Sequence, residues 1–186
     1  MIRISVPDTD AADPYGYAAR THATAIMAAA AAFARATYEH SRLPLREFEG
    51  ARMRIAQING CTICQQFRAA RDISAMFAGT GQRPQRLVSD NGPAPDENFY
   101  ADVGNWRHSA QFSARERLAL EYAERFAEEP KVLAQDEAFW SRARLLYSDA
   151  ELVDLAHCVA AWMGLGRVAH VLGFDSVCMP GLPGDR

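Results

Sequence analysis

The sequence predicts an all-α fold, a single-domain helical bundle with six to eight helices. No stretch of the 186 residues shows the sustained apolar–polar alternation of a strand. Residues 18–38 are rich in alanine, the residue with the highest helix propensity. Two S-x-x-E spacings, one starting at Ser113 and the other at Ser148, are typical of capping boxes that begin helices. A chain of this length suffices for one domain with a sizeable core.

The chain is expected to divide into three parts. Residues 1–20 contain Pro, Gly and Asp throughout and predict an irregular N-terminal arm, either mobile or docked on a neighbour. Residues 21–178 form the all-helical domain, and the turn-like residues 179–186 form a C-terminal tail. In the first half of the chain, Pro44 and Asn59-Gly60 separate successive helices. The helices expected there cover residues 18–38, 45–58 and 61–78.

A long connection is expected over residues 79–111, which are rich in Gly and Pro and contain one short helix around DENFYADVGNW. A connection this long inside a compact domain is often functional, for instance as a lid. Its aromatic residues Phe99, Tyr100 and Trp106 are candidates to wall a pocket or, alternatively, to form a satellite cluster. The remaining helices are expected between Ser113 and Pro130, over 136–147, and between Ser148 and Gly173.

Composition and charge exclude several classes of protein. The formal net charge of −3 provides no basic field for nucleic acid and argues against an anionic membrane as a partner. No run of about 18 apolar residues is present, so no transmembrane helix is expected, and the N-terminus has no signal-peptide pattern. Four cysteines in a chain this long do not make a disulfide scaffold. We therefore expect a cytoplasmic protein, in which a close cysteine pair is catalytic or metal-binding more often than structural.

Two cysteines, Cys61 and Cys64, stand three residues apart where a helix is expected to begin. The free N–H groups and the dipole at a helix N-terminus favour a thiolate, and this spacing places both sulfurs close enough to bridge. If the chain reverses at the preceding turn, Glu49 faces this pair and is a candidate acceptor of a thiol proton. A redox pair is one interpretation, and the others are two buried core cysteines or part of a metal site.

No metal is expected at this pair, because a zinc site needs about four ligands. The other cysteines, Cys158 and Cys178, and the nearby His157 match no ligand spacing. His157 is kept as a candidate supporting group, with a satisfied core or interface histidine as the alternative. For Glu49, the alternative to catalysis is a salt bridge with Arg52 at i+3.

The stretch EGARMRIAQINGCTIC resembles the signature of the carboxymuconolactone decarboxylase family, in its alkyl hydroperoxidase D-like branch. There a Glu precedes the first Cys of N-G-C-x-x-C by twelve residues, as Glu49 precedes Cys61. WRHSAQFSARERLALEYAE and YSDAELVDLAHCVAAWMGLGR are similar to the family's second conserved half, so the resemblance covers about residues 40–173. It implies an all-helical fold that assembles as trimers or hexamers. It also implies that Cys64 attacks peroxide and that the more exposed Cys61 then forms a disulfide with it as the resolving thiol. Cys61 would also meet the dithiol reductant, often a lipoylated protein. Glu49 would belong to a proton relay.

The chain departs from this family at two positions of its fullest proton relay, where Ile63 and Arg68 replace histidines. Arg68, one turn beyond Cys64, is a candidate to stabilise a thiolate. Dithiol–disulfide exchange depends less on such a relay than peroxide reduction does. The sequence thus predicts a thiol-dependent peroxidase or disulfide oxidoreductase that needs no metal or organic cofactor. The alternatives are a non-catalytic or redox-sensing helical oligomer and an enzyme of the same family that acts on a small organic acid.

Overall fold

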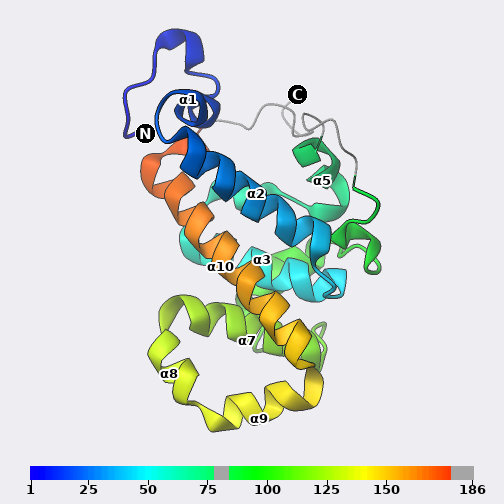
Figure 1. Cartoon of the computed structure of the whole chain (residues 1–186). Coiled ribbons are helices and arrows are strands. Elements are labelled where there is room, and N and C mark those ends of the chain that lie inside the picture. The colour runs from blue at the N-terminus through cyan, green and yellow to red at the C-terminus, as the bar shows by residue number, and fades with distance from the viewer. Residues whose placement is uncertain (78–83, 177–186) are drawn as a thin grey trace.

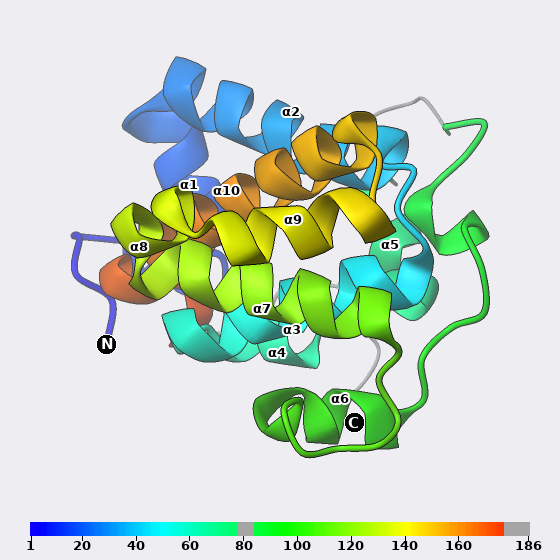
Figure 2. The same ribbon diagram turned by 90° about the horizontal axis from the view of Figure 1, so that it is seen from below.

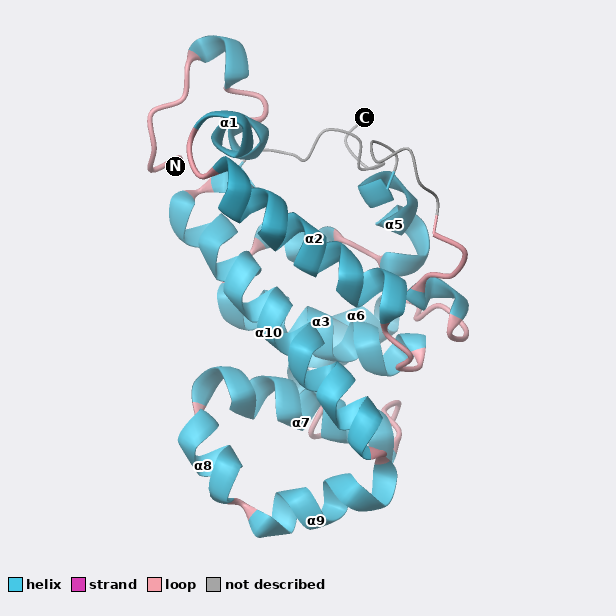
Figure 3. Cartoon of the chain, viewed as in Figure 1, coloured by secondary structure: helices cyan, strands magenta, loops and turns pink. Residues whose placement is uncertain are grey.

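The structure is a computed structural model that describes residues 1–77 and 84–176. Within these ranges every regular element is a helix, so the expected all-α class is confirmed (Figure 3). Cys178, the tail at 179–186 and residues 79–83 of the long connection lie outside the described residues. The ten α-helices of the described residues are α1 Pro14–Thr21, α2 Thr24–His40, α3 Leu45–Asn59, α4 Thr62–Gln66, α5 Ala69–Phe77, α6 Glu97–Asp102, α7 Ala114–Glu128, α8 Pro130–Gln135, α9 Glu137–Leu146 and α10 Asp149–Leu172. This exceeds the expected six to eight because several of them span only two turns or fewer.

Helix α3 lies at the centre of the fold and is buried along most of its length. It packs against α7 on one side and against α10 on another, while α2 runs beside α10 (Figure 1). Helices α8 and α9 carry the chain from the end of α7 back to the start of α10, and α9 lies beside α7 (Figure 2). The end of α3 and the start of α4 are thereby brought under the C-terminal part of α10.

Two apolar clusters stabilise this arrangement. The larger cluster joins the central helices through buried side chains such as Phe48, Phe139 and Leu155, each worth about 1.5–3 kcal/mol when removed from water. The smaller cluster contains Phe99, Tyr100, Val103, Trp106 and Phe112 of the long connection and packs on Met53 of α3 and Leu120 of α7. The aromatic residues of the long connection therefore form a satellite cluster, which is the second of the two alternatives.

The N-terminal arm is more ordered than the sequence suggested. Pro14 occupies the first turn of α1, and the Asp13 side chain caps this helix by accepting from the Gly16 N–H. The single helix expected over 18–38 is consequently two helices, α1 and α2. The arm docks on the end of α10, where Tyr15 packs edge-on against Phe174. It is thus held against its own chain.

The helix expected to begin at the cysteine pair is also two helices, α4 and α5. The chain is extended at Phe67, with φ −65° and ψ 138°. The Phe67 carbonyl accepts a hydrogen bond from the Arg52 guanidinium, and the Ala69 N–H donates to the Glu49 carboxylate. Backbone groups that would otherwise continue the helix are therefore bonded to two side chains of α3, and the helix ends and restarts.

The expected helix boundaries that rest on capping signals are confirmed. Both capping boxes are reciprocal, since Ser113 pairs with Glu116 and Ser148 with Glu151. Gly60 ends α3 in the left-handed region with φ 70°, and Gly173 ends α10 in the same way with φ 76°. Pro130 ends α7 as expected but also begins α8, because proline fits the first helical position.

Helix α10 is, among the described helices, the one long and apolar enough to cross a membrane by length and composition alone. The sequence predicted no such helix. In the fold α10 packs on α2, α3 and α7, and it buries Leu155, Val159 and Ala161 there. Its apolar character on this side is accounted for by packing within the protein.

Candidate functional site: a cysteine pair in the wall of an apolar cavity

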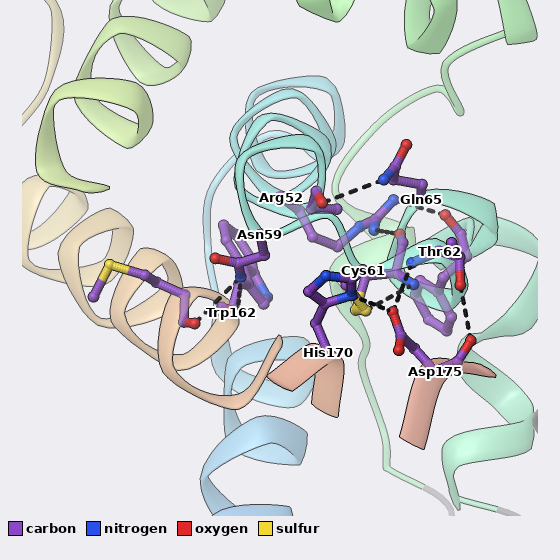
Figure 4. The surroundings of a disulfide bond; sticks show 12 residues. Arg52, Asn59, Cys61, Thr62, Gln65, Trp162, His170 and Asp175 are labelled. Carbon is purple, nitrogen blue, oxygen red and sulfur yellow. Dashed lines mark hydrogen bonds and ion pairs between the residues drawn. A yellow bond between two sulfur atoms is a disulfide. The ribbon is translucent and has the colours of Figure 1, made fainter. Parts of the chain in front are cut away.

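Cys61 and Cys64 form a disulfide at the junction of α3 and α4, with their Cα atoms 5.3 Å apart (Figure 4). The left-handed turn at Gly60 reverses the chain, so that Cys61 becomes the N-cap residue of α4. Its Sγ accepts a hydrogen bond from the Cys64 N–H at 3.3 Å. A thiolate released at Cys61 would keep this donor, which favours the charged form. The structure thus brings together the two cysteines that the sequence predicted to bridge.

The relative exposure of the two cysteines is the reverse of what the family resemblance implied. Cys61 is 1% exposed, whereas Cys64 is only partly buried. Cys61 is covered because the chain after α10 folds over it and bonds to the next residue, Thr62. Cys64 faces α10 at Gly166, where a Cβ would lie 3.8 Å from its sulfur.

A cavity of about 410 Å³ lies beside the disulfide, between α2 and α10. Both cysteines line it, and most of the other lining residues are apolar. From α2 the cavity is lined at helical spacing by Met27, Ala30, Ala31, Ala34 and Tyr38. Small alanine side chains leave the space between the two helices unfilled, so the alanine-rich segment forms a wall of the site. Polar groups are few, the main ones being Asp13, Arg52, Asn59 and Asp175.

Glu49 of α3 is 0% exposed. Its carboxylate accepts from Arg52 Nε at 2.5 Å and Nη2 at 3.2 Å, from the Tyr100 hydroxyl at 2.5 Å and from the Ala69 N–H at 3.2 Å. The Arg52 Nη1 donates in turn to the Cys64 carbonyl at 2.6 Å. Glu49 therefore faces α4 and α5 as expected, but it is linked to Cys64 through Arg52. The i,i+3 salt bridge is present, and the role of Glu49 in proton transfer stays a prediction.

The electrostatics of this network keep the Arg52 guanidinium charged. Burial by itself would lower the pKa of Arg52, but the adjacent Glu49 carboxylate more than reverses this effect, so the pKa is raised. Burial raises the pKa of Tyr100, and the Glu49 charge raises it further. Tyr100 is therefore a neutral phenol that donates to the side chain of Glu49.

A histidine–aspartate pair that the sequence did not predict covers the other side of Cys61. His170, at the end of α10, has Nδ1 2.9 Å from Asp175 Oδ2. The same carboxylate oxygen accepts from the Thr62 N–H at 3.2 Å, and the Asp175 carbonyl accepts from the Thr62 hydroxyl at 2.8 Å. Figure 4 shows His170, Asp175, Thr62 and the disulfide gathered at one place. No local sequence signal connects the end of α10 with residues so distant in the chain.

Arg68 and His157, the two candidate supporting residues, have other partners. Arg68 pairs with Glu97 at 2.8 Å and lies 3.9 Å over the Tyr100 ring. His157 is exposed on α10, with Nδ1 2.8 Å from the Val153 carbonyl. The structure therefore does not bring either side chain to the sulfurs.

Cys158 is buried and remote from the disulfide in its contacts. Its thiol donates to the Asp154 carboxylate at 3.3 Å, and burial together with this neighbouring charge raises the pKa of the thiol. Such a thiol stays protonated near neutral pH. Among residues 1–77 and 84–176, no group of three or more histidine, cysteine or carboxylate side chains is placed to hold a metal ion.

Comparison with known proteins supports the fold. No protein family's sequence profile matches the chain, and no curated protein sequence matches it. The structure is similar to the crystal structure of a protein of unknown function from Agrobacterium tumefaciens, whose proposed assignment is the antioxidant defence protein AhpD. The two share 19% sequence identity with a TM-score of 0.59, over 93% of this chain and 96% of that one. The chain thus has an alkyl hydroperoxidase D-like fold, with a C-x-x-C disulfide at its site.

Proposed function

We propose that this protein is a thiol–disulfide oxidoreductase that reduces hydroperoxides, or disulfides, with the Cys61–Cys64 pair. The observation that carries the proposal is the position of the pair, bridged at the start of α4 and lining an apolar cavity. The similarity in fold to a protein with a proposed assignment in antioxidant defence agrees with this activity.

The proposed cycle begins at Cys64, the more accessible cysteine. Its thiolate attacks the outer peroxide oxygen, the O–O bond breaks, and the alkoxide leaves and is protonated to an alcohol. The resulting Cys64 sulfenic acid is attacked by Cys61, which forms the disulfide and releases water. An external dithiol then reduces the disulfide and is itself oxidised. The cycle requires no metal and no organic cofactor.

The environment of the pair suits this chemistry. The apolar walls from α2 and α10 would accommodate the hydrocarbon part of an organic hydroperoxide or of a lipoyl-type dithiol. Arg52 holds the Cys64 carbonyl and is itself held by Glu49, so we assign both residues to positioning α4. Arg68 is assigned no role in thiolate stabilisation, because its charge is paired with Glu97.

We further propose that the protein is a cytoplasmic homo-oligomer, a trimer or hexamer. Helices α2 and α10 expose several apolar side chains, with Ile26 and Val168 at the cavity and Phe33, Val153 and Val171 elsewhere on the two helices. Contact between copies through these faces would remove this surface from water. Sedimentation at several protein concentrations measures the assembly.

The catalytic test is hydroperoxide consumption in the presence of a small dithiol. The wild-type protein is expected to turn over many times per chain, and Cys64→Ser is expected to abolish turnover. Cys158→Ser is the matched control, because this thiol is buried and bonded to Asp154. Undiminished turnover by Cys64→Ser would contradict the proposal.

A redox-sensing role without turnover is the second candidate. It is favoured by Ile63 and Arg68, which supply no proton relay next to the cysteines. In that case one equivalent of peroxide would oxidise the pair, but turnover with a dithiol would not exceed one cycle.

A further inference from the structure

The dyad of His170 and Asp175 contacts the chain on both sides of Cys61. The His170 Nε2 lies 3.2 Å from the position that a Cβ on Gly60 would occupy, directly before Cys61. Asp175 accepts from the backbone N–H of Thr62, directly after Cys61. An imidazole and its carboxylate thus contact the residues on either side of the buried cysteine, and both cysteines line the cavity.

The orientation of the imidazole follows from its partner. Asp175 is 7% exposed in its side chain and bonds Nδ1 of His170, so the neutral ring carries its proton on Nδ1. Nε2, the nitrogen on the side of Gly60 and Cys61, is left free to accept a proton. The His170 side chain is 49% exposed, which allows it to exchange that proton with solvent.

Glu49 lies on the side of Cys64. Its carboxylate accepts hydrogen bonds from Arg52, Tyr100 and the Ala69 N–H. Its hydrogen bonds connect it with the backbone of Cys64 and of the α4–α5 junction. The dyad is therefore the titratable group that contacts the residues flanking Cys61.

We propose that His170, oriented by Asp175, carries the proton for Cys61 in the formation and reduction of the disulfide. This inference rests on the proposed function. When the disulfide forms, His170 takes the proton from the Cys61 thiol, the Cys61 sulfur attacks the Cys64 sulfenic acid, and the S–O bond breaks. The departing hydroxide receives the proton and leaves as water. When a dithiol attacks Cys64, His170 takes up the proton that the attacking thiol releases, the S–S bond breaks, and the Cys61 thiolate receives that proton from His170.

The test separates the two steps of peroxide reduction. Reduced protein is mixed with one equivalent of an organic hydroperoxide, while a 1,3-dione traps sulfenic acid and mass spectrometry follows the disulfide. In His170→Gln we expect the first thiol to be oxidised at the wild-type rate. Disulfide formation is expected to slow by about 100-fold, the lower end of general acid–base effects, and the trapped sulfenic acid to accumulate.

Two further variants distinguish proton transfer from a structural role. His157→Gln makes the same substitution on the same helix at an exposed histidine without contact to the site, and it is expected to behave as wild type. In His170→Ala, imidazole added to the solution is expected to restore the rate of disulfide formation, because the side chain it replaces is half-exposed.

Disulfide formation at the wild-type rate in His170→Gln, or no rescue of His170→Ala by imidazole, would overturn the inference and leave the proposed function intact. Failure of the wild-type protein itself to form the disulfide would overturn both.

Discussion

Removal of the Glu49 carboxylate tests the ion pair under the cysteines. Glu49 and Arg52 have side-chain exposures of 0% and 3%, so neither is solvated. In Glu49→Ala the buried guanidinium loses its counter-charge and its two hydrogen bonds to that carboxylate. Loss of one partner of such a pair costs about 3–5 kcal/mol, a large fraction of the roughly 5–15 kcal/mol by which a domain is stable. The α4–α5 junction also loses the acceptor of its Ala69 N–H.

The assay is urea unfolding followed by circular dichroism at one protein concentration and in one redox state. Glu97→Ala is the matched control, because Glu97 also pairs with an arginine but is 72% exposed, where a pair is worth only about 0–1 kcal/mol. The double variant Glu49→Ala, Arg52→Met is expected to be more stable than Glu49→Ala alone, since no unpaired charge remains. This reasoning would be refuted if the decrease in the free energy of unfolding in Glu49→Ala were within about 1 kcal/mol of the decrease in Glu97→Ala.

Three further outcomes are expected. Ser113→Ala removes the acceptor for the Glu116 N–H and should lower the free energy of unfolding by about 1 kcal/mol, measured by urea unfolding. Burial raises the pKa of Tyr122 from 10.0 to about 12. The stability that this neutral phenol provides is therefore present below pH 10 and is lost as the pH rises towards 12. The melting temperature should fall over that interval. Cys158, a buried thiol whose pKa is raised, should resist alkylation in the native reduced protein and react only after unfolding, as mass spectrometry of the labelled protein would show.

The features predicted correctly from the sequence depend on short-range interactions. The capping boxes at Ser113 and Ser148 and the left-handed glycines Gly60 and Gly173 each act within a few residues, so their sequence pattern is sufficient. The start of α1 is local too, but the Asp13-Pro14 cap lies among Pro, Gly and Asp residues whose composition predicts an irregular arm.

The features that were missed depend on long-range contacts. The break between α4 and α5 is made by Arg52 and Glu49 from another helix, and no pattern within residues 61–78 shows it. The order of exposure in the cysteine pair was predicted wrongly because it depends on the chain after α10, which covers Cys61. The alanines of α2 that line the cavity recur at helical spacing, and this pattern is visible in the sequence. Composition alone, however, does not distinguish a cavity from a close contact between two helices.

The central claim is that Cys61 and Cys64 are an activated redox pair, and a count of free thiols tests it most directly. The thiols of the reduced native protein are counted before and after one equivalent of hydroperoxide, for the wild type and for Cys64→Ser. We expect the wild type to lose two thiols within minutes and to yield a peptide in which Cys61 is linked to Cys64, whereas Cys64→Ser is expected to form no such link. Persistence of all the thiols in the wild-type protein would contradict it.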